Sequence, residues 1–258
     1  MMNKQFPIDI SIPLDFNNEQ PNHFNVAKAK ASPIAAVNFI GDTRRGGSCN
    51  VQQISLIPHC NGTHTECIGH ITDERVFINE VLRDVVFPAT LVTIPPVLAA
   101  ESGDNYLPQL SADDRIIQKS QLEKALWNVK ADNLTGLIIR TQPNESSKKT
   151  MDYVEQPAPF FSMEAMQFIT NLPIKHLLVD MPSLDKLYDE GLLSTHHIWW
   201  NVPLGTHKLT EKSRRERTVT EMIFVPDEIP DGSYSVAIQI PNWCSDAAPS
   251  RVFLLPAT

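Results

Sequence analysis

The segment HCNGTHTECIGH, residues 59–70, brings three imidazoles and one carboxylate together around an Asn-Gly pair. His64 and Glu66 are two positions apart, so on an extended strand both side chains leave the same face. The Asn-Gly pair is typical of a turn, which can fold His59 back beside His64. We therefore predict that two imidazole nitrogens and one carboxylate oxygen meet at a divalent cation, which indicates a metal-dependent hydrolase.

Other interpretations of this segment stay open. Scattered histidines more often lie on the surface or in a core, but three of them with a Glu around a turn favour metal binding. Cys60 and Cys67 leave the identity of the metal open, because thiolate with imidazole suits zinc whereas imidazole with carboxylate also allows manganese or iron. His70 follows closely enough to act on whatever the metal holds.

The length and composition are those of an ordinary globular protein. The chain of 258 residues shows no internal repeat or low-complexity linker, so we predict a single domain over 1–258. The net charge of -8 argues against nucleic acid and an anionic membrane surface as partners. No window is apolar enough to span a bilayer, and the first residues lack the apolar stretch of a secretion signal, so we predict a cytoplasmic location.

The four cysteines provide no C-x-x-C pair, which argues against a zinc ribbon or a thioredoxin motif. A disulfide framework is not expected without a secretion signal. We interpret Cys49 and Cys244 as small buried hydrophobic residues.

Strands and helices alternate over residues 85–180, a pattern that predicts an α/β layer. Residues 205–218 are rich in Lys and Arg and are predicted to form a solvated loop. Ser120 and Ser162 are the predicted N-caps of two helices, Ser120–Val129 and Ser162–Thr170. The predicted strands are Phe6–Leu14, Ile34–Ile40, Cys49–Ile57, Val85–Ile94, Gly136–Thr141, His176–Val179, Val219–Val225, Ser233–Ile240 and Arg251–Leu255.

Glu221 stands in the middle of an apolar strand pattern. A carboxylate there is costly to bury unless it is paired or bound to a metal, so Glu221 is a second ligand candidate, with a buried ion pair as the alternative. The aromatic pairs Trp199-Trp200 and Phe160-Phe161 are candidates for the wall of a pocket that takes a planar substrate, although aromatic residues are more often core.

These landmarks together resemble the metal-dependent cyclase family, which includes bacterial kynurenine formamidases and isatin hydrolases. The family signature is His-x-Gly-Thr-His-x-Asp-x-Pro-x-His, to which residues 62–64 correspond, with Glu66 at the Asp position and His70 at the last His. Further similar segments, in the family's order, are Asp9-Ile10-Ser11, Asp180-Met181-Pro182-Ser183-Leu184-Asp185, His196-His197, Glu221 and Ala248-Pro249-Ser250-Arg251.

The resemblance implies an α/β protein with the family's swivelling β/β/α fold, in which mixed sheets carry flanking helices, and a homodimer. It also implies a site for one or two divalent metal ions, Zn²⁺ in the first place with Mn²⁺ as the alternative. His70 corresponds to the family's catalytic acid/base. The implied metal ligands are His59, His64, Glu66, His196 and Glu221.

The sequence departs from the signature at several points. The first His is one residue further from His64 than in the family, and strict alignment places Cys60 there. We favour His59, because a neutral imidazole needs no deprotonation to bind a metal. Glu66 replaces Asp, and Ile68 replaces Pro. Whether His196 or His197 is the ligand of the pair stays open.

The resemblance implies a hydrolase that cleaves the amide bond of a small molecule, a formamide or a lactam, as arylformamidases do. His70 would take a proton from water and return it to the leaving nitrogen, a role that suits an imidazole near neutral pH. The alternative is a non-catalytic protein of the same fold that binds a metal or a small molecule.

Overall fold

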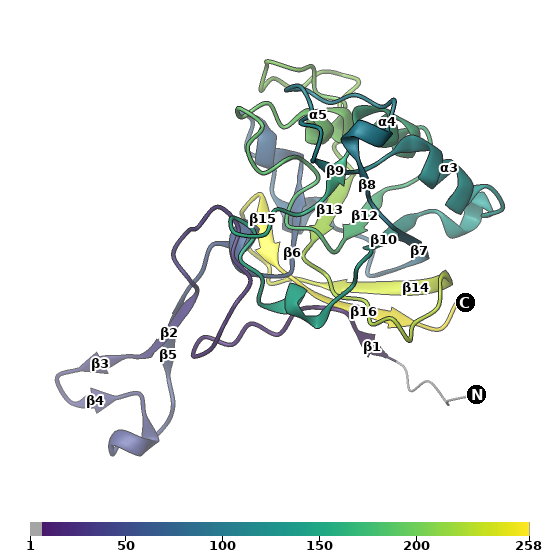
Figure 1. Cartoon of the computed structure of the whole chain (residues 1–258). Coiled ribbons are helices and arrows are strands. Elements are labelled where there is room, and N and C mark those ends of the chain that lie inside the picture. The colour runs from purple at the N-terminus through teal and green to yellow at the C-terminus, as the bar shows by residue number, and fades with distance from the viewer. Residues whose placement is uncertain (1–6, 258) are drawn as a thin grey trace.

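A curled sheet of nine strands organises residues 7–257, the part of the chain that the computed structural model describes (Figure 1). Four neighbouring strands, β7, β10, β12 and β13, run parallel, and the other neighbours pair antiparallel. From one edge to the other, the sheet consists of β1 (Ile8–Asp9), β16 (Arg251–Leu255), β14 (Gly232–Gln239), β7 (Val86–Ile94), β10 (Gly136–Thr141), β12 (His176–Val179), β13 (Thr218–Glu221), β6 (His64–Cys67) and β15 (Ala247–Pro249).

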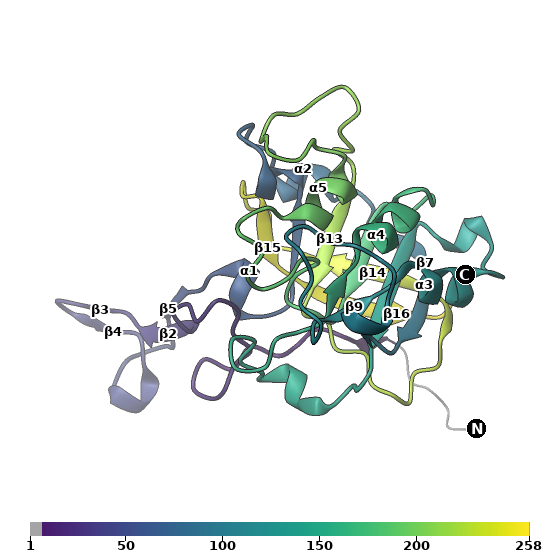
Figure 2. The same cartoon turned by 45° about the horizontal axis from the view of Figure 1, so that its top comes forward.

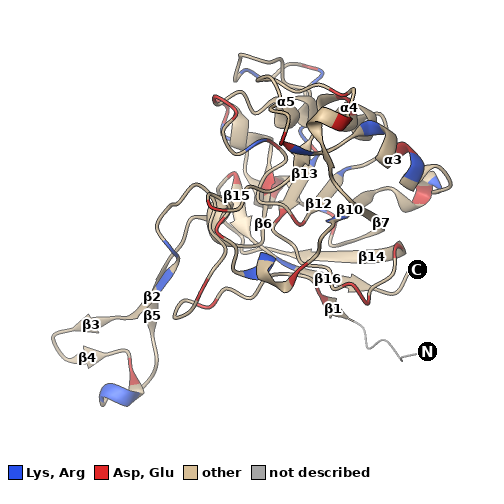
Figure 3. Cartoon of the chain, viewed as in Figure 1, with Lys and Arg blue, Asp and Glu red and all other residues tan. Residues whose placement is uncertain are grey.

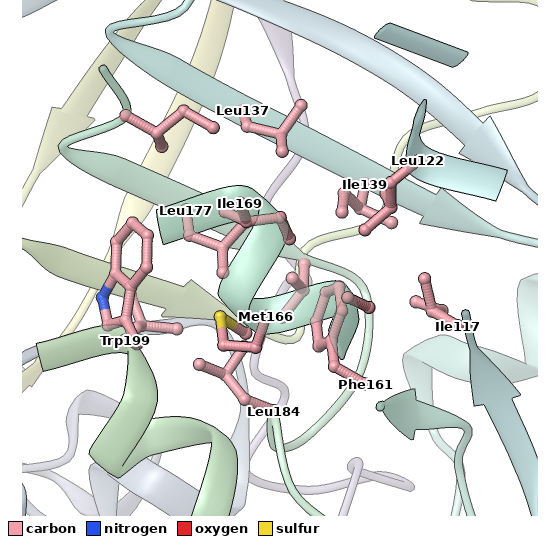
Figure 4. Packing of buried hydrophobic residues seen from close by; sticks show 14 of the residues in the cluster. Ile117, Leu122, Leu137, Ile139, Phe161, Met166, Ile169, Leu177, Leu184 and Trp199 are labelled. Atoms are coloured by element: carbon pink, nitrogen blue, oxygen red, sulfur yellow. The ribbon is translucent and has the colours of Figure 1, made fainter. Parts of the chain in front are cut away.

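Helices cover one face of the parallel strands. Successive strand residues point to opposite faces, so Leu137 and Ile139 of β10 pack toward the helices, whereas Ile138 packs on the other side. Figure 4 shows Leu137 and Ile139 among Met166, Ile169 and other members of this cluster. The covering helices are α3 (Lys119–Leu126), α4 (Met163–Thr170) and α5 (Ser194–Trp200).

The opposite face of the parallel strands is covered by β14 and β16, which belong to the same sheet. Val236 of β14 and Leu254 of β16 belong to the same buried cluster as Leu91 and Ile138 of the parallel strands. The sheet therefore curls over, and the molecule has two β layers and one helical layer. This arrangement confirms the predicted α/β class with a mixed sheet and flanking helices.

A long arm, residues 30–55, extends away from the body of the molecule (Figures 1 and 2). The sequence pattern predicts one strand over Ile34–Ile40, but the chain reverses at Val37-Asn38 and forms a hairpin, because Asn favours turns. The far end of the arm carries a basic 3-10 turn, seen in blue in Figure 3. The arm consists of β2 (Lys30–Pro33), β3 (Ala35–Ala36), β4 (Phe39–Ile40), the turn η1 (Thr43–Arg45) and β5 (Gln52–Ser55).

The other elements are short. A small sheet joins β8 (Val97–Leu98), β9 (Arg115–Ile117) and β11 (Phe160–Phe161), and two single-turn helices are α1 (Pro58–Asn61) and α2 (Ile78–Val81). Among residues 7–257, every helix is too short or too polar to cross a bilayer. The remaining 3-10 turns are η2 (Ile68–Ile71), η3 (Ala99–Glu101), η4 (Ala131–Asn133) and η5 (Ser146–Lys149).

Several local predictions can be compared with these elements. Ser162 caps α4, because its hydroxyl accepts a hydrogen bond from the amide of Ala165, which confirms that N-cap. The N-cap of α3 is Gln118 and not Ser120, because Gln118 forms a capping box with Gln121. The predicted strand Phe6–Leu14 is only the two-residue β1, and its first residue lies outside the described part of the chain.

Two further predictions are wrong. Cys49 and Cys244 are exposed and not buried, because Cys49 lies in the arm and Cys244 in the loop before β15. Strand β13 ends at Glu221, so this carboxylate stands at the end of a parallel strand and not in its middle.

Candidate metal centre

Strand β6 presents His64 and Glu66 on the same face, as its period of two predicts. The neighbouring strand β13 runs antiparallel to β6 and places Glu221 directly opposite His64. The Nε2 atom of His64 lies 3.2 Å from Oε2 of Glu221. Its Nδ1 lies 2.9 Å from the backbone oxygen of Gly62, which fixes the ring with Nε2 facing the carboxylates.

Helix α1 brings His59 to the same cluster. The predicted reversal of the chain is present, although it takes the form of a helical turn that begins with Pro58 and ends before Gly62. The Nε2 atom of His59 lies 3.4 Å from Oε2 of Glu66. The alternative residue, Cys60, belongs to none of the groups of neighbouring His, Asp and Glu side chains that could hold a metal among the described residues. Burial raises the pKa of its thiol to about 11.

Helix α5 contributes His196 from the other side of the cluster. The Nε2 atom of His196 lies 3.2 Å from Oε1 of Glu66 and 3.6 Å from Oε1 of Glu221. The next residue, His197, turns away, and its Nδ1 lies 3.1 Å from the backbone oxygen of Val202. Of the two histidines in the pair, His196 therefore faces the carboxylates.

Asp185 fixes the ring of His196 from behind. Its Oδ2 atom lies 2.5 Å from Nδ1 of His196, so the imidazole holds a proton there and directs Nε2 inward. Asp185 also accepts hydrogen bonds from the amide and hydroxyl of Thr195 and from the hydroxyl of Tyr106. A carboxylate that orients a histidine in this way is the usual outer-shell partner of a metal-binding imidazole.

The predicted catalytic residue, His70, lies at the edge of the cluster on the turn η2. Its Nδ1 atom is 3.8 Å from Oε2 of Glu66 and 3.6 Å from Oδ2 of Asp246, and its ring stacks on that of His59. Sequence reasoning assigned no role to Asp246, which lies just before β15 and also approaches Nε2 of His59 at 3.0 Å. A single Asp in a loop has no pattern around it in the sequence that would predict a place in the site.

The aromatic pairs proposed for a pocket wall belong to the core. Trp199 and Trp200 are fully buried, and Phe161 packs in the same cluster beneath the helices. Trp200 stacks on the ring of His196, with ring centroids 5.5 Å apart. Trp200 thus supports the candidate site from behind, whereas Phe160 lines a separate cavity of about 300 Å³.

The electrostatics of the cluster favour ionised carboxylates. Burial raises the pKa of Glu221, but the nearby imidazoles of His196 and His64 outweigh this effect and lower it below its usual value. For Glu66, burial likewise raises the pKa, and the charges and hydrogen bonds of His70 and His196 lower it. The pKa of Asp246 is lowered mainly by its interaction with His59. The cluster is therefore rich in negative charge at neutral pH.

Several buried atoms in the cluster lack a hydrogen bond. Nε2 of His59, Nε2 of His64 and Oε2 of Glu66 are buried. Each imidazole faces a carboxylate and Glu66 faces an imidazole, but none of the three atoms makes a hydrogen bond of acceptable geometry. Buried polar atoms normally have such partners, and their absence requires an explanation such as an ion. Imidazole nitrogens and carboxylate oxygens are suitable ligands for zinc or manganese, so the residues fit a divalent metal.

The curled mixed sheet with this buried His and Glu cluster defines the class of protein. Residues 8–186, more than half of the chain, match the model of the Cyclase family, described as putative cyclase. The chain belongs to this family.

Relatives and solved structures agree with this assignment. Kynurenine formamidase of Bacillus cytotoxicus is 24% identical over 251 residues, which cover 96% of this chain and 97% of that protein. Kynurenine formamidase of a Bacillus cereus strain is 25% identical over 255 residues, with the same coverage. Isatin hydrolase A from Ralstonia solanacearum has a similar fold, with a TM-score of 0.64 at 12% identity over 97% of this chain and 92% of that chain. A predicted metal-dependent hydrolase from Bacillus stearothermophilus has a TM-score of 0.62 at 17% identity, over 96% of this chain and 97% of that chain.

Proposed function

We propose that this protein is a metal-dependent amidohydrolase that cleaves the C–N bond of a formamide or lactam in a small aromatic substrate. The observation that carries the proposal is a continuous set of contacts of 3.6 Å or less that joins five buried or half-buried donor side chains. Three of these side chains offer atoms without a hydrogen bond. The relatives named kynurenine formamidase and the structural neighbours named isatin hydrolase support the substrate class.

The residues that would hold the metal are His59, His64, Glu66, His196 and Glu221. We favour Zn²⁺, with Mn²⁺ as the alternative, in one or two ions. When bound there, the metal would polarise a substrate carbonyl and lower the pKa of water toward neutrality.

His70 is the candidate for proton transfer. The carboxylates of Glu66 and Asp246 both lie near Nδ1 of His70, which favours a proton on that nitrogen. The lone pair of Nε2 is then available to accept a proton from water and to return it to the leaving nitrogen.

The proposal predicts amide cleavage that depends on a metal. Protein loaded with zinc or manganese is expected to hydrolyse formanilide, isatin or both, because the two compounds represent a formamide and a lactam. A chelator should abolish turnover, and addition of the metal should restore it. The measurement is product formation followed by ultraviolet absorbance, with metal content determined in parallel. Protein that holds one or two equivalents of metal and cleaves neither compound would contradict the proposal and favour a non-catalytic binding protein.

We further infer a homodimer in which a second copy covers the arm. The arm exposes apolar side chains far from the core: Val37 is 100% exposed, Ile54 53% and Ile34 38%. Apolar residues gathered on a projecting element are typical of an association surface. The double variant Val37→Lys/Ile54→Lys is therefore expected to be monomeric, whereas the wild type should show twice the chain mass of 28.9 kDa.

Light scattering after size exclusion measures both masses. The matched control is Val85→Lys/Val86→Lys, which charges two exposed valines before and at the start of β7 and should leave the dimer intact. A monomeric wild type, or a dimer in the arm variant, would refute this role of the arm.

A further inference from the structure

A cavity of about 310 Å³ opens near the carboxyl ends of β10 and β12. Thr141, the last residue of β10, and Asp180, which follows β12, both line it. Because β12 pairs in parallel with β13, the cavity is one strand away from Glu221. Ligands of α/β sheets usually bind at the carboxyl ends of parallel strands, so this position suits a part of a substrate held beside the metal centre.

Two charged groups of this cavity, Lys148 and Asp180, already satisfy each other. Nζ of Lys148 donates to Oδ2 of Asp180 at 2.7 Å and to both oxygens of Thr141 at 2.9 Å. Asp180 also accepts hydrogen bonds from the amide and the hydroxyl of Thr141. This charged pair therefore forms a fixed floor. Arg115, the other cation of the cavity wall, is exposed and donates to the backbone oxygen of Gln142 at 3.3 Å.

Tyr153 lines the same cavity, and its hydroxyl group has no partner. The residue is only 3% exposed, and the hydroxyl is buried without a hydrogen bond. Backbone hydrogen bonds in both directions join Tyr153 and Met151 to Asn22, which places the next residue, His23, against the tyrosine. The two rings stand nearly perpendicular, with centroids 6.4 Å apart.

His23 is likewise buried, at 3% exposure, and neither of its ring nitrogens has a hydrogen-bond partner. Its backbone amide donates to the oxygen of Cys60, so the residue is attached to the helical turn that carries His59. Burial lowers the pKa of His23 to about 4, and the charges of Glu221 and His64 also act on the ring. His23 thus contacts Tyr153 of the cavity wall and is joined to the turn that carries His59.

Three buried polar atoms without partners, on two neighbouring side chains, are costly for the folded protein unless a ligand satisfies them. We propose that His23 and Tyr153 form an uncharged hydrogen-bonding subsite, which binds a neutral polar group of the substrate such as a hydroxyl, a ketone or a carboxamide. The inference rests on the proposed function, because it assigns the part of the substrate remote from the scissile bond to this pair. An anionic group gains little here, because Lys148 is already paired with Asp180 and Arg115 is exposed to water, where an ion pair contributes little.

The test uses zinc-loaded full-length protein and calorimetric titration with three probes: benzamide, 3-hydroxybenzamide and 3-carboxybenzamide. We expect the wild type to prefer the hydroxyl compound over benzamide by about two- to tenfold, the effect of one good hydrogen bond. The carboxylate compound should bind no better than benzamide. In His23→Phe and in Tyr153→Phe the preference for the hydroxyl compound should disappear.

Thermal unfolding provides a second measurement, because a ligand-binding role and a structural role of these side chains predict different changes in Tm. Because the replaced polar atoms have no protein partner, both Phe variants should melt at or above the wild-type Tm. Tyr188→Phe, at a tyrosine that is 67% exposed, is the matched control and should change neither the preference nor the Tm. A lower Tm with an unchanged preference in both variants would show that these side chains only support the fold.

The titration also separates this inference from the proposed function. Wild-type protein that prefers the hydroxyl probe but cleaves no amide would retain the subsite and contradict the hydrolase. Wild-type protein that cleaves amides without this preference, or that binds none of the three probes, would overturn the subsite.

Discussion

Replacement of both His64 and Glu66 by Ala is expected to remove the bound metal and all turnover with it. The two side chains leave the same face of β6, and their Nε2 and Oε2 atoms are among the buried atoms without a hydrogen bond. Loss of one outer-shell partner alone typically lowers metal affinity by about 10- to 100-fold. Loss of two direct donors should therefore lower it by more than about 100-fold. Elemental analysis of the purified proteins, after incubation with zinc or manganese, measures this effect.

The matched control removes the same two residue types outside the cluster. The double variant His207→Ala/Glu74→Ala changes a histidine that bonds the backbone of Ile71 and a half-exposed glutamate that pairs with Arg215. It should keep the wild-type metal content. A wild type that binds neither ion, or a His64/Glu66 variant that binds as much as the wild type, would contradict the proposed metal centre.

His70→Asn is expected to lower kcat by about 10²- to 10⁴-fold, the usual contribution of a general acid/base. Asn keeps a polar side chain of similar size but cannot exchange a proton near neutral pH. Because His59, His64, Glu66, His196 and Glu221 stay in place, the metal content should not change.

Turnover and metal content must be measured on the same preparation, because Nδ1 of His70 lies near two carboxylates of the cluster. Loss of metal together with activity would show that His70 is a ligand, and retained activity would exclude it as the acid/base. His207→Asn is the control for the loss of an imidazole elsewhere.

Much of the candidate site could be predicted from short-range patterns in the sequence. The spacing of His64 and Glu66 predicted one shared face, and the strand geometry of β6 agrees. Glu221 was found because a carboxylate in an apolar pattern needs a partner, and His64 faces it in the structure. The first inference uses the period of a strand, which is fixed by the backbone. The second uses the cost of burying an unpaired carboxylate, and neither depends on the rest of the fold.

Contacts between distant segments could not be predicted in this way. Asp246 approaches His59 and His70 only because β15 pairs with β6, and β15 is too short to leave a strand pattern. His23 meets Tyr153 only because its loop is bonded to residues 151–153, more than a hundred positions away, and it reaches the centre through its bond to Cys60. The arm gave a misleading pattern, since two short strands around a turn at Asn38 have the same alternation as one longer strand.

The two outer strands of the large sheet, β1 and β15, have two and three residues. An outer strand offers unpaired amide and carbonyl groups, to which a strand of another molecule can add. Here β1 carries Asp9, which binds Arg251 of the neighbouring strand, and β15 ends at Pro249, which has no amide hydrogen to donate. A sheet of nine strands is thus protected against strand-by-strand growth into fibrous aggregates.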